Sequence, residues 1–383
     1  MSDPKLDGNP IMEGCGKYLP LILHGDGGAF QRADSILALS MRSLPSSSSV
    51  AHSQMLPLAL PKPAIHKSEI LAEDTRHCLW SVLTWSMQHM YFGKFPEKAA
   101  DGKDWQHKSP RGQKAGTLLN SAGLCGMIFA ITAGGEFFQN EYKLPGSSHA
   151  ECCWGCGANR SSHPHNDYRP GAKWRETIKN HKDSNPTDHL IMTVPGINGY
   201  TLAYDSLHIL ELGASAHIVA NFMHGGESRI ARQLFCVRAK QVRRLIPPLL
   251  ELSQDLADES SYKKHRLERI RNLNRMYEAM ECQGLHPDES AYEQHKRSTE
   301  KCLLNNSKPA KIAISQNILQ WNTAHKHHLA CHMPEQFSHL NCRFVSTYSG
   351  ETMVGFMVAS LGHACLTGTP PHLVPASLAL LHI

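Results

Sequence analysis

Acidic side chains at two distant points of the sequence could hold a divalent cation. Asp26 follows the apolar run 21–23 within Leu-Ile-Leu-His-Gly-Asp-Gly-Gly, and Glu351 lies at the start of an expected late helix. An aspartate at the exit of a buried strand, beside glycines that allow close approach, is where metal-dependent phosphoryl-transfer folds place a carboxylate. Taken separately, Asp26 also fits an ordinary turn, and Glu351 fits a favourable helix-dipole interaction.

Cysteines and histidines indicate a second kind of metal chemistry. Cys153 and Cys156 have the Cys-x-x-Cys spacing that directs two thiolates at one tetrahedral zinc ion. Two more ligands are needed, and the spacing of Asp205 and His208 offers an equivalent pair. Cysteines packed in a reducing cell explain the motif equally well. Nearer histidines that compete as ligands are His149, His163 and His165.

A histidine-rich segment provides a third candidate. His328 and His332 are four residues apart, so they share one face if the segment is helical. Such a pair could bind a metal. Without a carboxylate partner, it is more typical of a structural role or of groups that orient an active site.

Positive charge is concentrated in one region. Twelve Lys/Arg and five Asp/Glu lie between Arg229 and Arg275, a local excess of +7, whereas the whole chain carries +5. Basic helices here could follow the phosphates of duplex DNA or could be ordinary solvated faces. The residues expected to contact phosphates are Arg243, Arg244, Lys263 and Lys264, and the acids that could neutralise them instead are Glu251, Asp255, Asp258 and Glu259.

Composition limits the classes of protein to consider. The 383 residues contain no apolar run of the roughly 20 residues that a membrane-spanning helix requires, so a membrane protein is not expected. The first residues lack the apolar segment of a secretory signal. The twelve cysteines are therefore expected in a reducing compartment rather than in a disulfide framework.

Hydrophobic periodicity predicts strands and helices first, and then mostly helices. The segment from Pro145 to Gly199 has almost no periodicity. So long an irregular segment is expected to need a stabilising interaction, such as a bound metal ion. Expected strands are 18–24, 35–41 and 124–131. Expected helices are 69–92, a short one ending near 142, then 206–222, 239–256, 262–283, 289–304 and 350–366.

The order of these motifs resembles the CACTA-like (En/Spm-type) DDE transposases, over about 18–369. That family has an RNase H-like sheet that supplies two aspartates, a helical insertion, and a glutamate on a late helix. A Cys-x-x-Cys and a Cys/Asp-x-x-His signature lie between the second aspartate and the glutamate. The resemblance therefore implies Asp26 and Glu351 as catalytic ligands of Mg²⁺ or Mn²⁺.

Two departures from the family pattern imply impaired activity. The family's second aspartate corresponds to Gly134, and Glu136, two residues later, would have a different direction and reach. The chain also has little room for an N-terminal DNA-binding domain before Tyr18 and stops soon after the expected glutamate helix. The resemblance thus implies a degenerate, truncated copy.

The expected fold is α/β, an RNase H-like mixed sheet interrupted by a zinc-held loop and a large helical insertion. The expected function is that of a nuclear, transposase-derived protein that binds double-stranded DNA, with structural Zn²⁺ held by Cys153, Cys156, Asp205 and His208. Self-association is left open. The alternatives are a non-catalytic zinc-containing DNA-binding or interaction protein and a zinc protein unrelated to DNA. The expected parts are a disordered 1–17, a first core part 18–145, a Cys/His-rich 146–204, a basic helical 205–340, the Glu351 helix in 341–370 and a disordered 371–383.

Overall fold

The computed structural model of the chain is a mixed α/β structure in two compact units. Unit 1 comprises Met1–Lys143, His181–Ala203 and Tyr348–Ile383, and unit 2 comprises Leu144–Asn180 and Tyr204–Thr347. The residues described are 17–29, 35–46, 53–61, 69–179, 186–224, 239–255, 261–281, 283–315, 317, 321, 323–338 and 340–367. The expected disordered ends, apart from Lys17, lie outside these residues.

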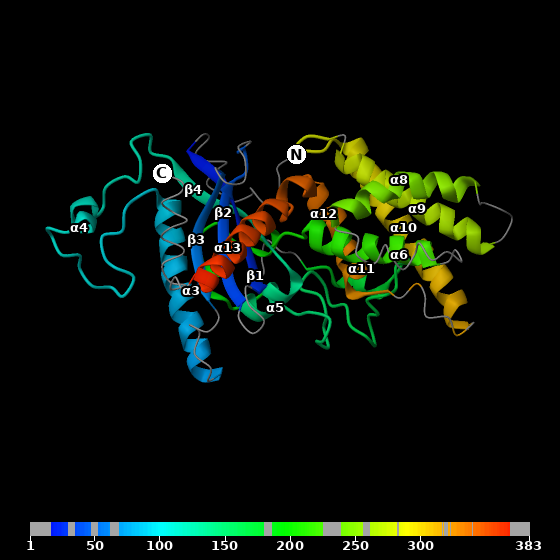
Figure 1. The fold of residues 1–383 in the computed structure, drawn as a ribbon, viewed down its shortest axis with the longest axis horizontal. Coiled ribbons are helices and arrows are strands. Elements are labelled where there is room, and N and C mark those ends of the chain that lie inside the picture. Colours follow the sequence, from blue (N-terminus) through cyan, green and yellow to red (C-terminus); the bar gives the residue numbers. More distant parts are fainter. Residues whose placement is uncertain are drawn as a thin grey trace. The chain divides into compact units, whose positions relative to one another are not determined.

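Unit 1 is built on a four-stranded mixed sheet with the order β3-β2-β1-β4 (Figure 1). Strand β1 pairs antiparallel with β2 and parallel with β4, and β2 pairs antiparallel with β3. The strands are β1 (Tyr18–Ala29), β2 (Ser35–Ser43), β3 (Gln54–Pro61) and β4 (Cys125–Ala133).

Alternation along β1 directs neighbouring residues to opposite faces of the sheet. A Cβ atom on Gly28 would lie 2.6 Å from Val358, and one on Gly25 would lie 2.3 Å from Phe137. Val358 belongs to helix α13 (Tyr348–Thr367), and Phe137 belongs to helix α5 (Gly135–Tyr142). Helix α13 therefore covers the face to which residues 24, 26 and 28 of β1 point, and α5 lies on the other face.

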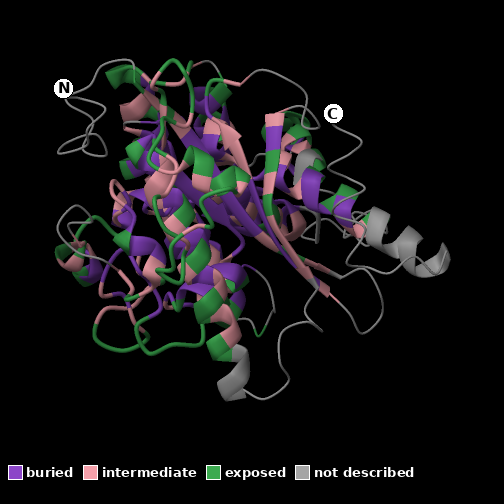
Figure 2. Cartoon of the chain, turned by 90° about the vertical axis from the view of Figure 1, so that its left-hand side faces the viewer, coloured by how far each residue is buried: buried purple, intermediate pink, exposed green. Residues whose placement is uncertain are grey.

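Apolar contacts fix α13 on the sheet. Figure 1 shows it crossing the strands, and Figure 2 shows that the middle of the sheet is buried. Hydrophobic burial of this kind contributes roughly 25 cal/mol per Å². The core between α13 and the sheet joins Ile36 and Ala38 of β2 to Met353, Val354 and Met357 of the helix.

The long helix α3 (Glu69–Phe92) packs against β4 and has the bounds expected from its periodicity. Trp80 of α3 lies 5.2 Å from the ring of Tyr142 in α5 and donates a hydrogen bond to Glu141. Beyond β4, Leu202 forms a parallel bridge with Ile131, next to the short helix η4 (Gly199–Thr201).

Unit 2 consists mainly of helices. The longest, α9 and α10, pack along one another, and α8 packs against α9. Arg269, on α9, is fully buried, donates to Asn306 and lies 3.7 Å over the ring of Trp321. The helical segments are η2 (Lys173–Thr177), η5 (Leu207–Ala214), α6 (Ser215–His224), α8 (Ala239–Asp255), α9 (Ser261–Glu281), α10 (Glu289–Ser315), α11 (His325–Ala330), α12 (Met333–Phe337) and η7 (Cys342–Val345).

The elements differ from the sequence expectation in several places, among them the expected helix 206–222, which is divided into η5 and α6 by non-helical backbone at Gly213. Strand β1 continues past His24 to Ala29, so Asp26 lies within the strand rather than at its exit. Strand β3 is additional to the expected strands, and α10 extends to Ser315. Among the helices that the structure describes, none combines the length and apolar character needed to cross a membrane.

Candidate metal centres

Unit 2 contains a compact group of four buried potential metal ligands. One ligand atom each from Cys153, Cys156, His328 and His332 lies within 4.8 Å of all the others. The Cys153 sulfur is 3.4 Å from Nε2 of His332, and the Cys156 sulfur is 3.3 Å from Nε2 of His328. A tetrahedral zinc ion with bonds of about 2.3 Å to sulfur and 2.0 Å to nitrogen separates those atoms by about 3.5 Å. The spacing therefore fits a Cys₂His₂ metal site.

Local structure positions both halves of this group. The cysteines lie in a turn closed by a hydrogen bond from the backbone of Cys152 to Ala158, 3.0 Å long. His328 lies on α11, and His332 directly precedes α12. Four-residue spacing over one helical turn brings the two rings to the same side.

Hydrogen bonding fixes which nitrogen of His328 faces the sulfurs. Its Nδ1 lies 3.0 Å from the carbonyl oxygen of His165, so a proton on Nδ1 would donate to that oxygen and leave Nε2 as a ligand. Nδ1 of His332 lies 3.9 Å from the Glu335 carboxylate, which is an ion-pair distance rather than a hydrogen bond. Metal-binding histidines commonly have such second partners.

Electrostatics favour one thiolate even without a metal ion. A hydrogen bond from Cys153, supported by His328 and His332, lowers the pKa of the Cys156 thiol. Burial raises the pKa of Cys153 well above its ordinary value. Zinc binding would require the remaining thiol proton to leave, which completes a pair of thiolate ligands.

Aromatic rings enclose the group. The ring of Trp174 lies 4.7 Å from His328 and 5.5 Å from His332, and Tyr204 stacks on His332 at 5.5 Å. All four ligands are buried. A closed shell of four protein ligands is typical of a structural metal site rather than a catalytic one.

The structure corrects the predicted zinc ligand set. Asp205 and His208 are not members of the group, and they bond to one another, with Nδ1 of His208 2.6 Å from the Asp205 carboxylate. Thr347 donates its hydroxyl and its backbone N–H to the same carboxylate, at 2.7 and 3.0 Å. Burial would raise the pKa of Asp205, but the hydrogen bonds from His208 and Thr347 outweigh it and lower that pKa. These contacts make Asp205 an anchor inside unit 2.

Unit 1 contains a second, different group of potential ligands. Atoms of His24, Asp26 and Glu351 lie within 4.8 Å of one another. His24 and Asp26 project from the same face of β1, and Glu351 lies in the first turn of α13. His24 is buried, whereas the carboxylates are partly accessible. The fold therefore brings together two acids that are far apart in the sequence.

Gly134 lies beside this group. Ala133 pairs with Gly25 at the end of β4, so Gly134 follows at the level of Asp26. It caps α5 with φ −66° and ψ 153°, a conformation open to any residue. Glu136 is exposed in the first turn of α5, outside the ligand group.

The predicted phosphate-binding residues of unit 2 differ in their surroundings. Arg244 and Lys264 are exposed. Arg243 bonds to Glu281 and lies 5.7 Å over the ring of Tyr277. Lys263 is half-buried. Of the proposed neutralising acids, Asp258 and Glu259 lie outside the described residues, as do Arg229, Arg232 and Arg238.

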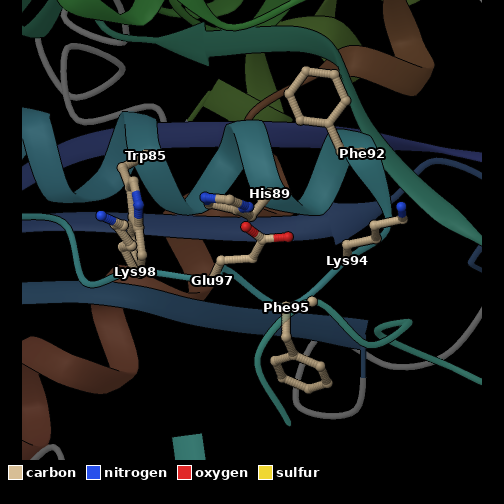
Figure 3. A pocket seen from close by; sticks show the side chains of 8 residues that line it. Trp85, His89, Phe92, Lys94, Phe95, Glu97 and Lys98 are labelled. Carbon is tan, nitrogen blue, oxygen red and sulfur yellow. The ribbon is translucent and has the colours of Figure 1, made fainter. Parts of the chain in front are cut away.

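A pocket of about 500 Å³ lies beside the C-terminal half of α3. Figure 3 shows His89 and Glu97 facing one another near its middle. Burial lowers the pKa of His89, and Glu97 opposes that change. None of its lining residues belongs to either metal-ligand group among the described residues. The lining residues are Trp85, His89, Phe92, Lys94, Phe95, Glu97, Lys98 and Gly116.

Comparisons with protein-family models and with curated proteins found no match to this chain.

Proposed function

We propose that unit 1 derives from an RNase H-like nuclease of the DDE transposase type, which acts on the phosphodiester backbone of duplex DNA, and that its own activity is impaired. The convergence of Asp26 and Glu351 carries this proposal. A mixed sheet with an aspartate on its first strand and a glutamate on a late helix is the arrangement that the resemblance implies. A divalent cation held there would activate water or a DNA 3′-hydroxyl and stabilise the leaving oxygen.

The residues of unit 1 have distinct parts in this proposal. Asp26 and Glu351 would supply carboxylate oxygens to the cation from β1 and α13, which are in close contact where Gly28 meets Val354 and Val358. Their partial exposure leaves one side of the group accessible to a substrate, as a reactive site requires.

The Cys₂His₂ group of unit 2 supports a structural zinc ion, with Cys153, Cys156, His328 and His332 as ligands. Four buried N and S ligands suit Zn²⁺ better than Mg²⁺ or Ca²⁺, which prefer oxygen. Zinc would hold the irregular chain around Cys153 to the helices that follow it. A nuclear location and binding to duplex DNA are parts of the same proposal.

Cleavage of supercoiled plasmid DNA tests this function. The zinc-loaded full chain should nick the plasmid slowly in Mn²⁺ or Mg²⁺, and Asp26→Asn and Glu351→Gln should each reduce that slow rate by at least about a hundredfold. Glu136→Gln is a matched control because Glu136 is exposed outside the group. Equal nicking by all four proteins would rule out Asp26 and Glu351 as the ligands.

A non-catalytic DNA-binding protein is the second candidate. It is favoured by Gly134, which offers no side chain where the related enzymes place their second aspartate. Such a protein would retard DNA on a gel in a salt-dependent manner and would leave it uncut.

A further inference from the structure

The cation site of unit 1 includes an imidazole beside its two acids. We propose that His24 is the third protein ligand of this site, which makes it a His-Asp-Glu site for a divalent transition ion such as Mn²⁺. This inference rests on the proposed function of Asp26 and Glu351. It concerns which metal ion the site binds. In this arrangement His24, on β1, takes the place of the missing second aspartate as a ligand.

The position of His24 follows from strand geometry. Residues two apart on a strand project to the same face, so His24 and Asp26 both face α13. Gly350, the neighbour of Glu351, agrees with this direction, because a Cβ atom there would lie 2.1 Å from Cδ2 of the His24 ring. One turn of α13 therefore packs against the imidazole and also supplies the glutamate.

Hydrogen bonding orients the imidazole toward the acids. Nδ1 of His24 lies 3.2 Å from the carbonyl oxygen of Thr132, its neighbour on β4. Nδ1 also lies 3.4 Å from the Thr132 hydroxyl oxygen. In the tautomer with its proton on Nδ1, the ring donates to the Thr132 carbonyl oxygen and leaves the lone pair of Nε2 on the side of Glu351. A ligand histidine whose other nitrogen donates to a backbone carbonyl is the usual arrangement in metal sites.

The distance between His24 and Glu351 fits one shared ion. Nε2 of His24 and Oε1 of Glu351 are 3.8 Å apart. This exceeds the roughly 3.2 Å upper limit of an ordinary hydrogen bond. It is shorter than the sum of two metal–ligand bonds of about 2.1 Å each, so one ion can contact both atoms. The alternative is an ion pair between an imidazolium and Glu351.

An imidazole ligand changes which cations the site prefers. Mg²⁺ selects oxygen ligands in near-ideal octahedral geometry, whereas Mn²⁺ and the later divalent ions bind imidazole nitrogen increasingly well. The expected order of affinity is therefore Mn²⁺ above Mg²⁺. His24 itself is only 3% exposed, so little water competes for its ring nitrogens.

Pulsed electron paramagnetic resonance of bound Mn²⁺ tests the inference directly. The full chain is first loaded with Zn²⁺ to fill the Cys₂His₂ group, and Mn²⁺ is then added. The wild type should show ¹⁴N modulation from one coordinated imidazole. His24→Gln should lose that modulation and bind Mn²⁺ on the order of tenfold more weakly.

Two controls separate the possible failures. His77→Gln, which removes an exposed histidine of α3, should keep both the modulation and the affinity. Mn²⁺ binding that depends on Asp26 and Glu351 but shows no ¹⁴N modulation in the wild type would overturn the role of His24 and leave the proposed function standing. Mn²⁺ binding unchanged by Asp26→Asn and Glu351→Gln would overturn both. The wild-type spectrum decides between these outcomes even if His24→Gln folds poorly.

Discussion

The two ligand groups of this chain differ both in their residue types and in their surroundings. In unit 2, Cys153, Cys156, His328 and His332 are all buried and offer two sulfurs and two nitrogens. In unit 1, one buried histidine stands beside two carboxylates that are partly accessible. A closed N/S shell satisfies an ion completely, whereas an open N/O group leaves room for a substrate. Burial and ligand chemistry together therefore separate a site that stabilises a fold from a site that could react.

The difference also concerns how each group is assembled. The unit 2 group closes an irregular segment onto two short helices, which have little hydrogen-bonded structure of their own. The unit 1 group lies on a sheet and a helix that are already packed by an apolar core. We therefore expect metal loss to unfold part of unit 2 and to leave unit 1 folded.

Removal of a sulfur ligand should have the largest effect. Cys153→Ser should abolish binding of one zinc ion and lower the free energy of unfolding of unit 2 by several kcal/mol, because structural zinc contributes roughly 10 kcal/mol or more to small zinc domains. Zinc analysis and thermal unfolding measure both changes. Cys152→Ala is the matched control, since Cys152 is equally buried but outside the group. If both variants lost stability equally and both kept zinc, the structural role would be wrong.

Acid should destabilise unit 2 independently of the metal. Burial lowers the pKa of His295 to about 3 from an ordinary 6.5. As the pH falls, His295 is therefore protonated at a higher pH in the unfolded state than in the folded state. The stability from neutral His295 is complete above the ordinary pKa and is lost as the pH falls toward about 3. Between pH 7 and 5 the loss should be about 2 kcal/mol.

Replacement of His295 separates this loss from metal release. His295 stacks on Phe337 at 4.2 Å, so His295→Phe should preserve the packing. It should also reduce the slope of the free energy of unfolding against pH by the amount that corresponds to one proton. Denaturant unfolding at several pH values measures it. An unchanged slope would mean that the acid sensitivity belongs to other groups.

A carboxylate at position 134 should increase the difference between the two ligand groups, because it adds oxygen ligands to the group in unit 1. Gly134→Asp places an acid beside Asp26 and should tighten Mn²⁺ binding on the order of tenfold, with a larger relative gain for Mg²⁺. An aspartate there could also cap α5, and Gly134→Asn would cap it equally without the charge. Calorimetric titration compares the three proteins. Equal gains from Asp and Asn would attribute the effect to the helix rather than to the ion.

The smallest effect is expected from charge on the helices of unit 2. Arg244→Glu and Lys264→Glu should weaken duplex DNA binding a few-fold for every sequence and reduce the slope of log affinity against log salt by roughly 1 for each phosphate that is no longer neutralised. Arg243→Gln is the comparison, because Arg243 bonds to Glu281. Fluorescence anisotropy at several salt concentrations measures the change. A stronger effect from Arg243→Gln than from the other two would mean that DNA does not bind through the exposed cations.

Local patterns predict much of unit 1. The bounds of the helix 69–92 and the β1–β2 pairing follow from hydrophobic periodicity, which local residues determine. Strand β3 escapes such a prediction because Pro57 and Pro61 argue against a strand, yet an edge strand tolerates proline. The approach of Asp26 to Glu351 could be expected only from the order of motifs, since no local signal links the two.

The zinc partners could not be chosen from spacing alone. The chain has 25 histidines, and the pairs at Asp205 and His328 both fit a second half-site. The contacts that separate them are long-range. The carboxylate oxygens of Asp205 accept hydrogen bonds from His208, from nearby backbone and from Thr347. The rings of His328 and His332 face the cysteine sulfurs. The sequence does not single out His24 as a ligand because Thr132, which orients its ring, lies on β4 and Glu351 lies on α13.

The bond between Asp205 and Thr347 has a consequence for how the chain tolerates change. These residues lie at the two ends of the long segment Tyr204–Thr347, so its ends are tied together at the base. The segment is therefore a long loop whose two ends are held together. Doubling the length of such a loop costs only about 0.6 kcal/mol in closure entropy. Helices could therefore be added to or removed from this segment over evolutionary time while the strand and helix that carry Asp26 and Glu351 kept their spacing.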